Sequence, residues 1–292
     1  MDSSSSLRGA LLAVAASAGF ATLAVFGRWA LEAGMTANTL LQWRFGLAAL
    51  VMAALGHLRH PLPGKLRALL FGSGLVYTTQ TSFYFVGLER ISAGTTALLL
   101  YLAPLFVVIY GRVFFGRRAS KGQLLAVALG LMGLGIIVGL PSAADSDPIG
   151  IAFGAAAGAV LAWYVLAGEL LFAKVPPLVT AAHTMAGAAV GFVAVDLVDG
   201  HIALPQTGEH WLLIGAVVVI PTLVSIPMLF AAIAKLGAGP TAVISNAEPV
   251  FTALLGALFL AEAIGPTQAV GAVLILGAAT VAQRTAQPRP NP

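Results

Sequence analysis

Long apolar runs, separated by short polar connections, recur about every 25 to 30 residues, which is typical of membrane-spanning helices joined by short loops. A helix rises about 1.5 Å per residue, so about 20 apolar residues cross the hydrocarbon core of a bilayer. The pattern therefore predicts an all-α integral membrane protein with ten transmembrane helices. Their expected ranges are residues 7–26, 36–55, 66–88, 93–115, 124–140, 149–172, 178–198, 211–234, 241–260 and 267–282.

Two of the predicted helices share a sequence pattern. Residues 93–106 read AGTTALLLYLAPLF and residues 238–251 read AGPTAVISNAEPVF, so six residues coincide at an offset of 145 (238 minus 93). The offset is almost half of the 292 residues in the chain, which indicates a duplicated unit. We therefore expect a first five-helix repeat in residues 1–143 and a second in residues 144–292.

A proline stands in the middle of each matching segment. Pro104 removes the helical hydrogen bond to the carbonyl of Leu100, and Pro249 removes the bond to the carbonyl of Ser245. Helices interrupted at corresponding places in two halves of a membrane protein point to a transporter's binding site. The freed carbonyls are expected either to accept from a substrate ammonium or to be met by a neighbouring Thr or a water.

Composition supports the membrane assignment and excludes several classes of function. The chain is 59% hydrophobic and only 9% charged, with a mean hydropathy of +0.95, whereas soluble domains carry about 25% charged residues. The cations lie in loops rather than in one patch, which argues against a nucleic-acid partner. With no cysteine, disulfides and thiolate metal sites are excluded. The N-terminus runs into the first apolar segment without a cleavage signal, so we expect a retained first helix.

Lysine and arginine concentrate in alternate loops. If the N-terminus lies in the cytoplasm, the outer loops hold only Arg28 and Arg90, and all other loop cations lie inside. This predicts that both termini are cytoplasmic. Because five helices are an odd number, the second repeat must be inverted, and the charges agree: Arg117 follows the fourth helix inside, whereas Glu262 follows the ninth outside. Inverted repeats provide two near-equivalent packings, one open to each side.

These features resemble the drug/metabolite transporter superfamily, EamA type. The resemblance rests on Arg44, on the two segments from Gly94 to Pro104 and from Gly239 to Pro249, and on LFLAE ending at Glu262 with Gln268 and Gly271 after it. It covers nearly the whole chain and implies ten helices in two inverted halves. It is specific for the fold but not for the substrate. Where the family carries an acid after the fourth helix, this chain has Arg117.

Within the superfamily the length and the deep aromatic residues are most similar to bacterial aromatic amino-acid exporters of the YddG type. This resemblance implies a multi-pass protein of the bacterial inner membrane that carries a small molecule. We expect no cofactor and no metal, an amino acid and the lipid bilayer as partners, and possible action as a monomer.

Polar and aromatic residues about ten positions into a helix lie near the bilayer midplane, where polar groups are costly unless they face the interior of the bundle. In residues 66–88, Tyr77, Gln80, Thr81 and Tyr84 fall on one helical face. That face lines either a cavity or a helix–helix contact glued by hydrogen bonds. Candidate substrate-binding residues are Trp43, Arg44, Tyr77, Gln80, Tyr84, Tyr101, Trp163, Ser245, Asn246 and Glu248.

Arg44 and Glu248 are the two opposite charges predicted near the midplane. They form either a clamp for substrate carboxylate and ammonium, with Glu248 as an alternative proton-coupling acid, or a structural ion pair between the halves. Trp163 follows a run of glycine and alanine, which suggests a large ring forming the wall of a cavity. Tyr101 and Asn246 occupy equivalent positions, three residues before each proline.

An anionic cargo requires several convergent cations, and a polycation requires several acids; neither set is present. A neutral zwitterion with an apolar side chain fits the aromatic, neutral-polar inventory better. The sequence therefore predicts export of aromatic and other neutral amino acids by alternating access. The alternatives are an amine or hydrophobic-drug exporter that uses Glu248 with aromatic rings, and a non-transporting scaffold subunit. An enzyme is not expected, since HExxH and nucleophile-elbow motifs are absent from the sequence.

Overall fold

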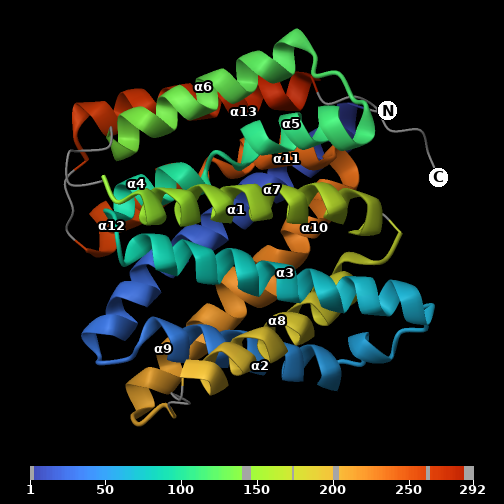
Figure 1. The fold of residues 1–292 in the computed structure, drawn as a ribbon, viewed down its shortest axis with the longest axis vertical. Helices are drawn as coiled ribbons and strands as arrows, with labels where there is room; N and C mark the ends of the chain where they lie inside the picture. The colour runs from blue at the N-terminus through green and yellow to red at the C-terminus, as the bar shows by residue number, and fades with distance from the viewer. Residues whose placement is uncertain (1–2, 140–145, 173, 200–203, 261–263, 286–292) are drawn as a thin grey trace.

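The computed structural model describes residues 3–139, 146–172, 174–199, 204–260 and 264–285, and the elements in these ranges are helices (Figure 1). The predicted all-α class is confirmed for this part of the chain. In chain order the elements are α1 (Ser3–Glu32), α2 (Ala37–Ala54), η1 (His57–Arg59), α3 (Gly64–Leu88), α4 (Ala93–Leu100), α5 (Ala103–Phe115), α6 (Lys121–Val138), α7 (Pro148–Phe172), α8 (Pro177–Asp199), α9 (Gly208–Val218), the π-helical η3 (Val219–Val224), α10 (Ser225–Leu236), α11 (Ala238–Ser245), α12 (Glu248–Phe259) and α13 (Pro266–Thr285).

Eight helical segments are long and apolar enough to cross a membrane, fewer than the ten predicted. Three of them join consecutive elements: α4 with α5, α9 with η3 and α10, and α11 with α12. The helices α2 and α3, which the sequence also predicts to span, are outside this set of eight. Their hydropathy is lowered by polar residues such as Gln42 and Arg44 in α2 and Lys65, Arg67 and Gln80 in α3.

The two proline-containing segments are broken at equivalent places. Helix α4 ends at Leu100 and α5 begins at Ala103, whereas α11 ends at Ser245 and α12 begins at Glu248. Ser245 and Glu248 each lie 145 residues after their counterparts, Leu100 and Ala103. Both prolines stand in the first turn of the second helix, where a missing N–H costs nothing. The break that the sequence predicts is therefore present in both segments.

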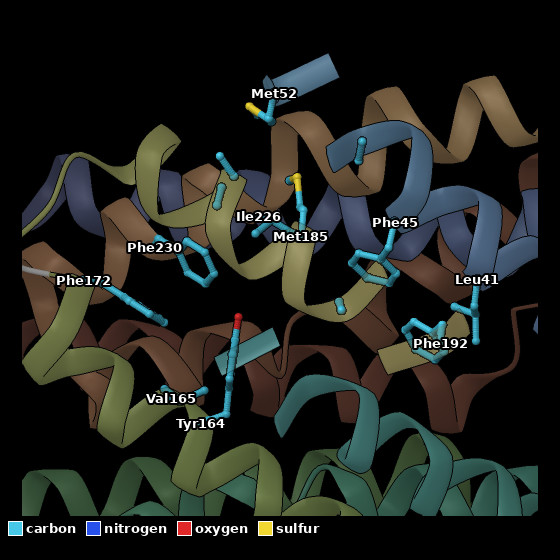
Figure 2. Packing of buried hydrophobic residues seen from close by; sticks show 14 of the residues in the cluster. Leu41, Phe45, Met52, Tyr164, Val165, Phe172, Met185, Phe192, Ile226 and Phe230 are labelled. Atoms are coloured by element: carbon cyan, nitrogen blue, oxygen red, sulfur yellow. The ribbon is translucent and has the colours of Figure 1, made fainter. Parts of the chain in front are cut away.

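Small residues allow helices to pack closely in the interior. A Cβ on Gly187 of α8 would collide with the backbone carbonyl of Phe71 in α3, and one on Gly158 of α7 would lie 2.5 Å from the carbonyl oxygen of Leu99 in α4. Large rings fill another part of the core. Figure 2 shows Phe172 and Phe230 near Tyr164, with centroids of the first two 4.2 Å apart, and Phe45 beside Phe192. Such close backbone approach is typical of membrane helix packing.

The start of α1 and the end of α13 meet at one end of the bundle. The hydroxyl of Ser6 lies 3.5 Å from the carbonyl oxygen of Gln283. Lys235 packs beside Gly9, and Gly122 packs beside Thr285, so the ends of α10 and α13 and the start of α6 lie here too. We call this end of the bundle, which contains Ser6, Gly122, Lys235 and Gln283, the basic end. Glu262 lies outside the described residues, so its predicted place at the opposite end stays a prediction.

Candidate functional site

A cavity of about 330 Å³ is lined by residues from α1, α2, α3, α4, α5, α7, α8, α10, α11 and α12. Its volume is in the range of sites for small organic ligands. Eight of the ten predicted substrate-binding residues line it: Arg44, Tyr77, Gln80, Tyr84, Tyr101, Ser245, Asn246 and Glu248. The tertiary structure thus brings together residues that are up to 204 positions apart (248 minus 44).

The polar face of α3 points into this cavity. Tyr77, Gln80, Thr81 and Tyr84 all line it, because they repeat at the helical period. The adjacent face of α3 is used for packing instead: Ser73 hydrogen-bonds Thr184 of α8 at 2.9 Å, and the Thr78 hydroxyl donates to the carbonyl of Ala188 at 3.3 Å. One helix therefore supplies both the predicted cavity face and a hydrogen-bonded helix contact.

The two helix breaks place their last residues in the cavity wall. Leu100 and Tyr101 at the end of α4, and Ser245 and Asn246 at the end of α11, are all lining residues. Tyr101 and Asn246 are the C-caps of their short helices. At these positions the chain leaves the helix, so backbone carbonyls and side chains can both face the cavity.

Arg44 is held by the π-helical segment η3. Its side chain is almost fully buried, and its Nε donates to the Thr222 hydroxyl at 2.7 Å while a terminal nitrogen donates to the Pro221 carbonyl at 3.2 Å. Thr222 in turn donates to the carbonyl of Val217 at 2.8 Å. These bonds leave Arg44 only part of its donor set for a ligand. These bonds connect α2 to the irregular segment η3.

Glu248 lines the cavity from the start of α12, beside Tyr101. Arg44 and Glu248, which are both described, form no ion pair within 4.0 Å. No direct contact therefore joins them, although each is an electrostatic neighbour of the other. The choice between a substrate clamp and a structural ion pair stays a prediction. The two charges face one cavity, with Tyr77 as a further electrostatic neighbour of Arg44.

The two predicted tryptophans lie elsewhere. Trp163 is 42% exposed and packs against Tyr110 and Phe114 on the outside of α7, with centroids 6.1 and 5.6 Å away. Trp43 packs edge-on against Trp211 at 5.1 Å and is absent from the cavity lining in the described residues. Each tryptophan is next in sequence to a lining residue, and one step along a helix turns the side chain by about 100°.

Tyr164 is the main site residue that the sequence reasoning missed. It lines the cavity, and Figure 2 shows its hydroxyl directed away from the α7 backbone toward the space between the rings. The signal was present in the sequence, because Gly154, Ala157, Leu161 and Tyr164 follow the helical period and share a face, whereas Trp163 does not. Phe20, Phe45 and Phe85 were missed as well, since an apolar ring in a membrane helix resembles ordinary core.

Thr241, near the start of α11, adds a polar group without a protein partner. It is fully buried, lines the cavity, and its hydroxyl makes no hydrogen bond in the described structure. A buried hydroxyl usually has a partner. Thr241 is therefore well placed to bond a ligand or a water within the cavity.

The cavity combines many rings with few charges. Arg44 and Glu248 are the only charged residues among its described lining. Seven aromatic side chains line it: Phe20, Phe45, Tyr77, Tyr84, Phe85, Tyr101 and Tyr164. In the described part of the chain, no group of three or more metal-ligating side chains comes together. The arrangement suits an uncharged or zwitterionic molecule with an apolar body.

Known proteins resemble this chain along most of its length. The pattern of the EamA-like transporter family matches residues 7–139 and 148–283. The uncharacterized transporter YcbK of Bacillus subtilis is 27% identical over 86% of this chain and 85% of its own length. The threonine/homoserine exporter RhtA of Escherichia coli is 26% identical over 79% and 77%. The aromatic amino acid exporter YddG of Ancylobacter novellus is 26% identical over 68% and 70%.

A solved crystal structure shares the fold. It superposes with a TM-score of 0.79 and covers 95% of this chain and 98% of its own, at 24% sequence identity.

Proposed function

The chain belongs to the EamA-like transporter family, and on that premise we propose that it exports aromatic and other neutral amino acids by alternating access. The observation that carries this proposal is the cavity lined by seven rings and by only two charged residues within its described lining. Relatives named as exporters of threonine and homoserine, and of aromatic amino acids, support the same class of cargo.

The proposed roles follow the chemistry of the lining. The rings of Tyr84, Tyr101 and Tyr164 hold an aromatic or apolar side chain. Glu248 and the carbonyls at the ends of α4 and α11 receive the ammonium group, and Gln80, Asn246 and Thr241 bond the remaining polar atoms. Arg44 contributes the positive field that favours a carboxylate, while remaining bonded to η3.

The architecture that we propose has ten spanning helices, with α2 and α3 added to the eight apolar segments. Burial among neighbouring helices makes their polar residues tolerable in a bilayer. We propose that residues 1–143 and 144–292 are inverted repeats; the two family matches and the equivalent positions of the two helix breaks support this. We further place the basic end in the cytoplasm of a bacterial inner membrane and propose that one chain is sufficient for transport.

The test is flux of labelled phenylalanine in liposomes that contain the purified protein. We expect saturable flux that tryptophan, phenylalanine and threonine inhibit by competition. As a matched pair, Tyr84→Ala is expected to weaken phenylalanine flux, whereas Trp163→Ala, which removes a ring outside the cavity, is not. Absence of flux with every amino acid in a competition panel would remove this proposal and favour a non-transporting scaffold.

An amine or hydrophobic-drug exporter is the second candidate, because Glu248 is the one carboxylate in the described cavity lining and lies among tyrosine rings. Glu248→Gln separates the two candidates. It keeps the shape of the side chain but removes its charge, so it is expected to abolish transport of an aromatic amine. Transport of a zwitterion, which also has other polar contacts, is expected to be weakened only.

A further inference from the structure

A second cavity, of about 360 Å³, lies at the basic end and shares no lining residue with the central cavity. We call it the vestibule. Its wall contains Arg117 and Arg118, just after α5, and Glu169 near the end of α7. Gly237, Gly239 and Gln123 also line it, at the starts of α11 and α6. Oppositely charged side chains thus face one space next to both ends of the described chain.

An ion pair lies in the wall of the vestibule. Gly116 adopts the left-handed conformation (φ 63°) and ends α5, so that the backbone N–H of Arg117 bonds the Gly111 carbonyl at 2.9 Å. The Arg117 side chain then reaches Glu169, with one nitrogen 3.0 Å from each carboxylate oxygen. Glu169 also accepts from the backbone N–H of Ala238 at 3.0 Å. This set of bonds links the α5–α6 connection to α7 and to the start of α11.

The vestibule and the central cavity approach each other along three helices. Val107, Leu166 and Val243 line the vestibule and are at most 3% exposed. Their close neighbours along the same three helices, Ala103, Val165 and Ala242, line the central cavity. On α5, α7 and α11 the lining therefore passes from one cavity to the other within about one helical turn. The ion pair joins these same three regions of the chain.

We propose that the vestibule is a loading site for the zwitterionic cargo and that the pair Arg117–Glu169 is the latch of the inner gate. This inference rests on the proposed function and adds a second site to it. A zwitterion carries both charges needed to release the latch: its carboxylate replaces Glu169 on Arg117, and its ammonium replaces Arg117 on Glu169. A molecule with a single charge can pair with only one of the two, and Glu169, whose side chain is 10% exposed against 44% for Arg117, is the costlier one to leave unpaired.

Accessibility of single cysteines tests the proposal, because the natural chain has no cysteine. Ala119→Cys places a thiol in the vestibule wall, and Ala242→Cys places one in the wall of the central cavity. A membrane-impermeant thiol reagent is applied from the side of the basic end. In the Ala119→Cys protein, phenylalanine is expected to slow labelling more than phenethylamine does at the same concentration, and phenylacetate is expected to slow it least. Adding Glu169→Gln is expected to remove this protection.

The latch itself is measured in the Ala242→Cys protein. Glu169→Gln is expected to raise its labelling rate about two- to fivefold, because it removes a partly exposed ion pair, while its amide oxygen can still accept from the Ala238 N–H. Arg112→Ala, which removes a cation in the last turn of α5 that is absent from the described vestibule lining, is the matched control and is expected to leave this rate unchanged. Equal labelling of Ala119→Cys with and without Glu169→Gln, in the absence of ligand, shows that the variant is folded.

Either absence of phenylalanine protection or an unchanged rate for Ala242→Cys would overturn the proposal. Its failure is distinguishable from failure of the proposed function. If the protein transports phenylalanine in liposomes but labelling is independent of Glu169, the proposed latch is wrong and the proposed function is retained. If the protein transports no amino acid in liposomes but phenylalanine still slows labelling of the Ala119→Cys protein in a way that depends on Glu169, the proposed function is wrong and the loading site is retained.

Discussion

The broken helices α4–α5 and α11–α12 have the same backbone plan but different side chains. Both end a short helix after eight residues and begin the next with a proline in its first turn. At equivalent positions the first segment has Leu100, Tyr101 and Ala103, and the second has Ser245, Asn246 and Glu248. The first break thus offers a ring and apolar surface, and the second offers an amide, a hydroxyl and a carboxylate.

The breaks also differ in what supports them. The end of α4 packs directly on α7, where a Cβ on Gly158 would lie 2.5 Å from the Leu99 carbonyl oxygen and 3.0 Å from that of Leu100. Near the end of α11, a Cβ on Gly130 of α6 would lie at an ordinary 3.7 Å from the Asn246 amide nitrogen. One break is fixed by backbone contact, and the other has room for its polar side chain. A repeated backbone can therefore serve two chemical roles.

Glu248→Ala tests the two chemical roles most severely, because alanine is the residue at the equivalent position, Ala103, in the first break. The loss of a hydrogen-bonding charge is expected to lower amino-acid flux about 10- to 100-fold. Labelled phenylalanine uptake into liposomes measures the change, with Trp163→Phe as a control outside the cavity. Flux within about twofold of the natural protein would mean that both breaks act only through their backbones.

Asn246→Leu and Tyr101→Phe compare the two C-cap positions. Each removes hydrogen-bonding capacity at an equivalent place, and neutral hydrogen bonds are worth about 0.5–1.5 kcal/mol, or a change of about 2- to 10-fold. We expect Asn246→Leu near the upper limit and Tyr101→Phe near the lower one, because the phenyl ring keeps its packing. The measurement is the ratio of the flux of each variant to that of the natural protein at low substrate concentration. The reverse order would invert the proposed division of roles.

Gly158→Ala and Gly130→Ala compare the two supports. The added methyl group at Gly158 meets backbone carbonyls, so it is expected to lower the free energy of unfolding by about 1–3 kcal/mol. At Gly130 the space is sufficient, and alanine favours a helix by up to about 1 kcal/mol, so stability is expected to be unchanged or higher. Thermal unfolding in detergent distinguishes the two. Equal melting temperatures would contradict the claim that only the first break is fixed by close contact.

The smallest expected effect lies at the start of α7, the helix that supports α4. Hydrogen bonds from the backbone N–H groups of Gly150 and Ile149, together with Arg90, hold the pKa of Asp147 below its ordinary value. A carboxyl group whose pKa is lowered by folding stabilises the fold at pH values above its pKa in the unfolded chain, which is about 3.9. This stabilisation is lost as the pH falls through the lowered pKa of the folded protein. Asp147→Ala is expected to reduce the melting temperature slightly at pH 7, and the difference should shrink below about pH 4. A difference that grows at low pH would reverse the assigned sign.

Much of the fold was predictable because its signals are local. Apolar runs placed the helices, prolines placed both breaks, and the offset of 145 residues related them. The irregular segment η3 was not predicted. Its π-helical turns around Pro221 are held partly by Arg44 from a distant helix, and sequence periodicity cannot reveal that contact.

The sequence by itself determined that this is a helical membrane protein with two similarly broken segments, because bilayer thickness and the missing proline N–H act on each stretch of chain separately. It also placed Tyr77, Gln80 and Tyr84 on one face, since helical period is a local property. Only the tertiary structure decided that Tyr164 rather than Trp163 faces the cavity, that Arg44 bonds η3 rather than Glu248, and that Arg117 pairs with Glu169. Each of these depends on how helices far apart in sequence rotate and pack against one another, and a single helix does not fix that choice.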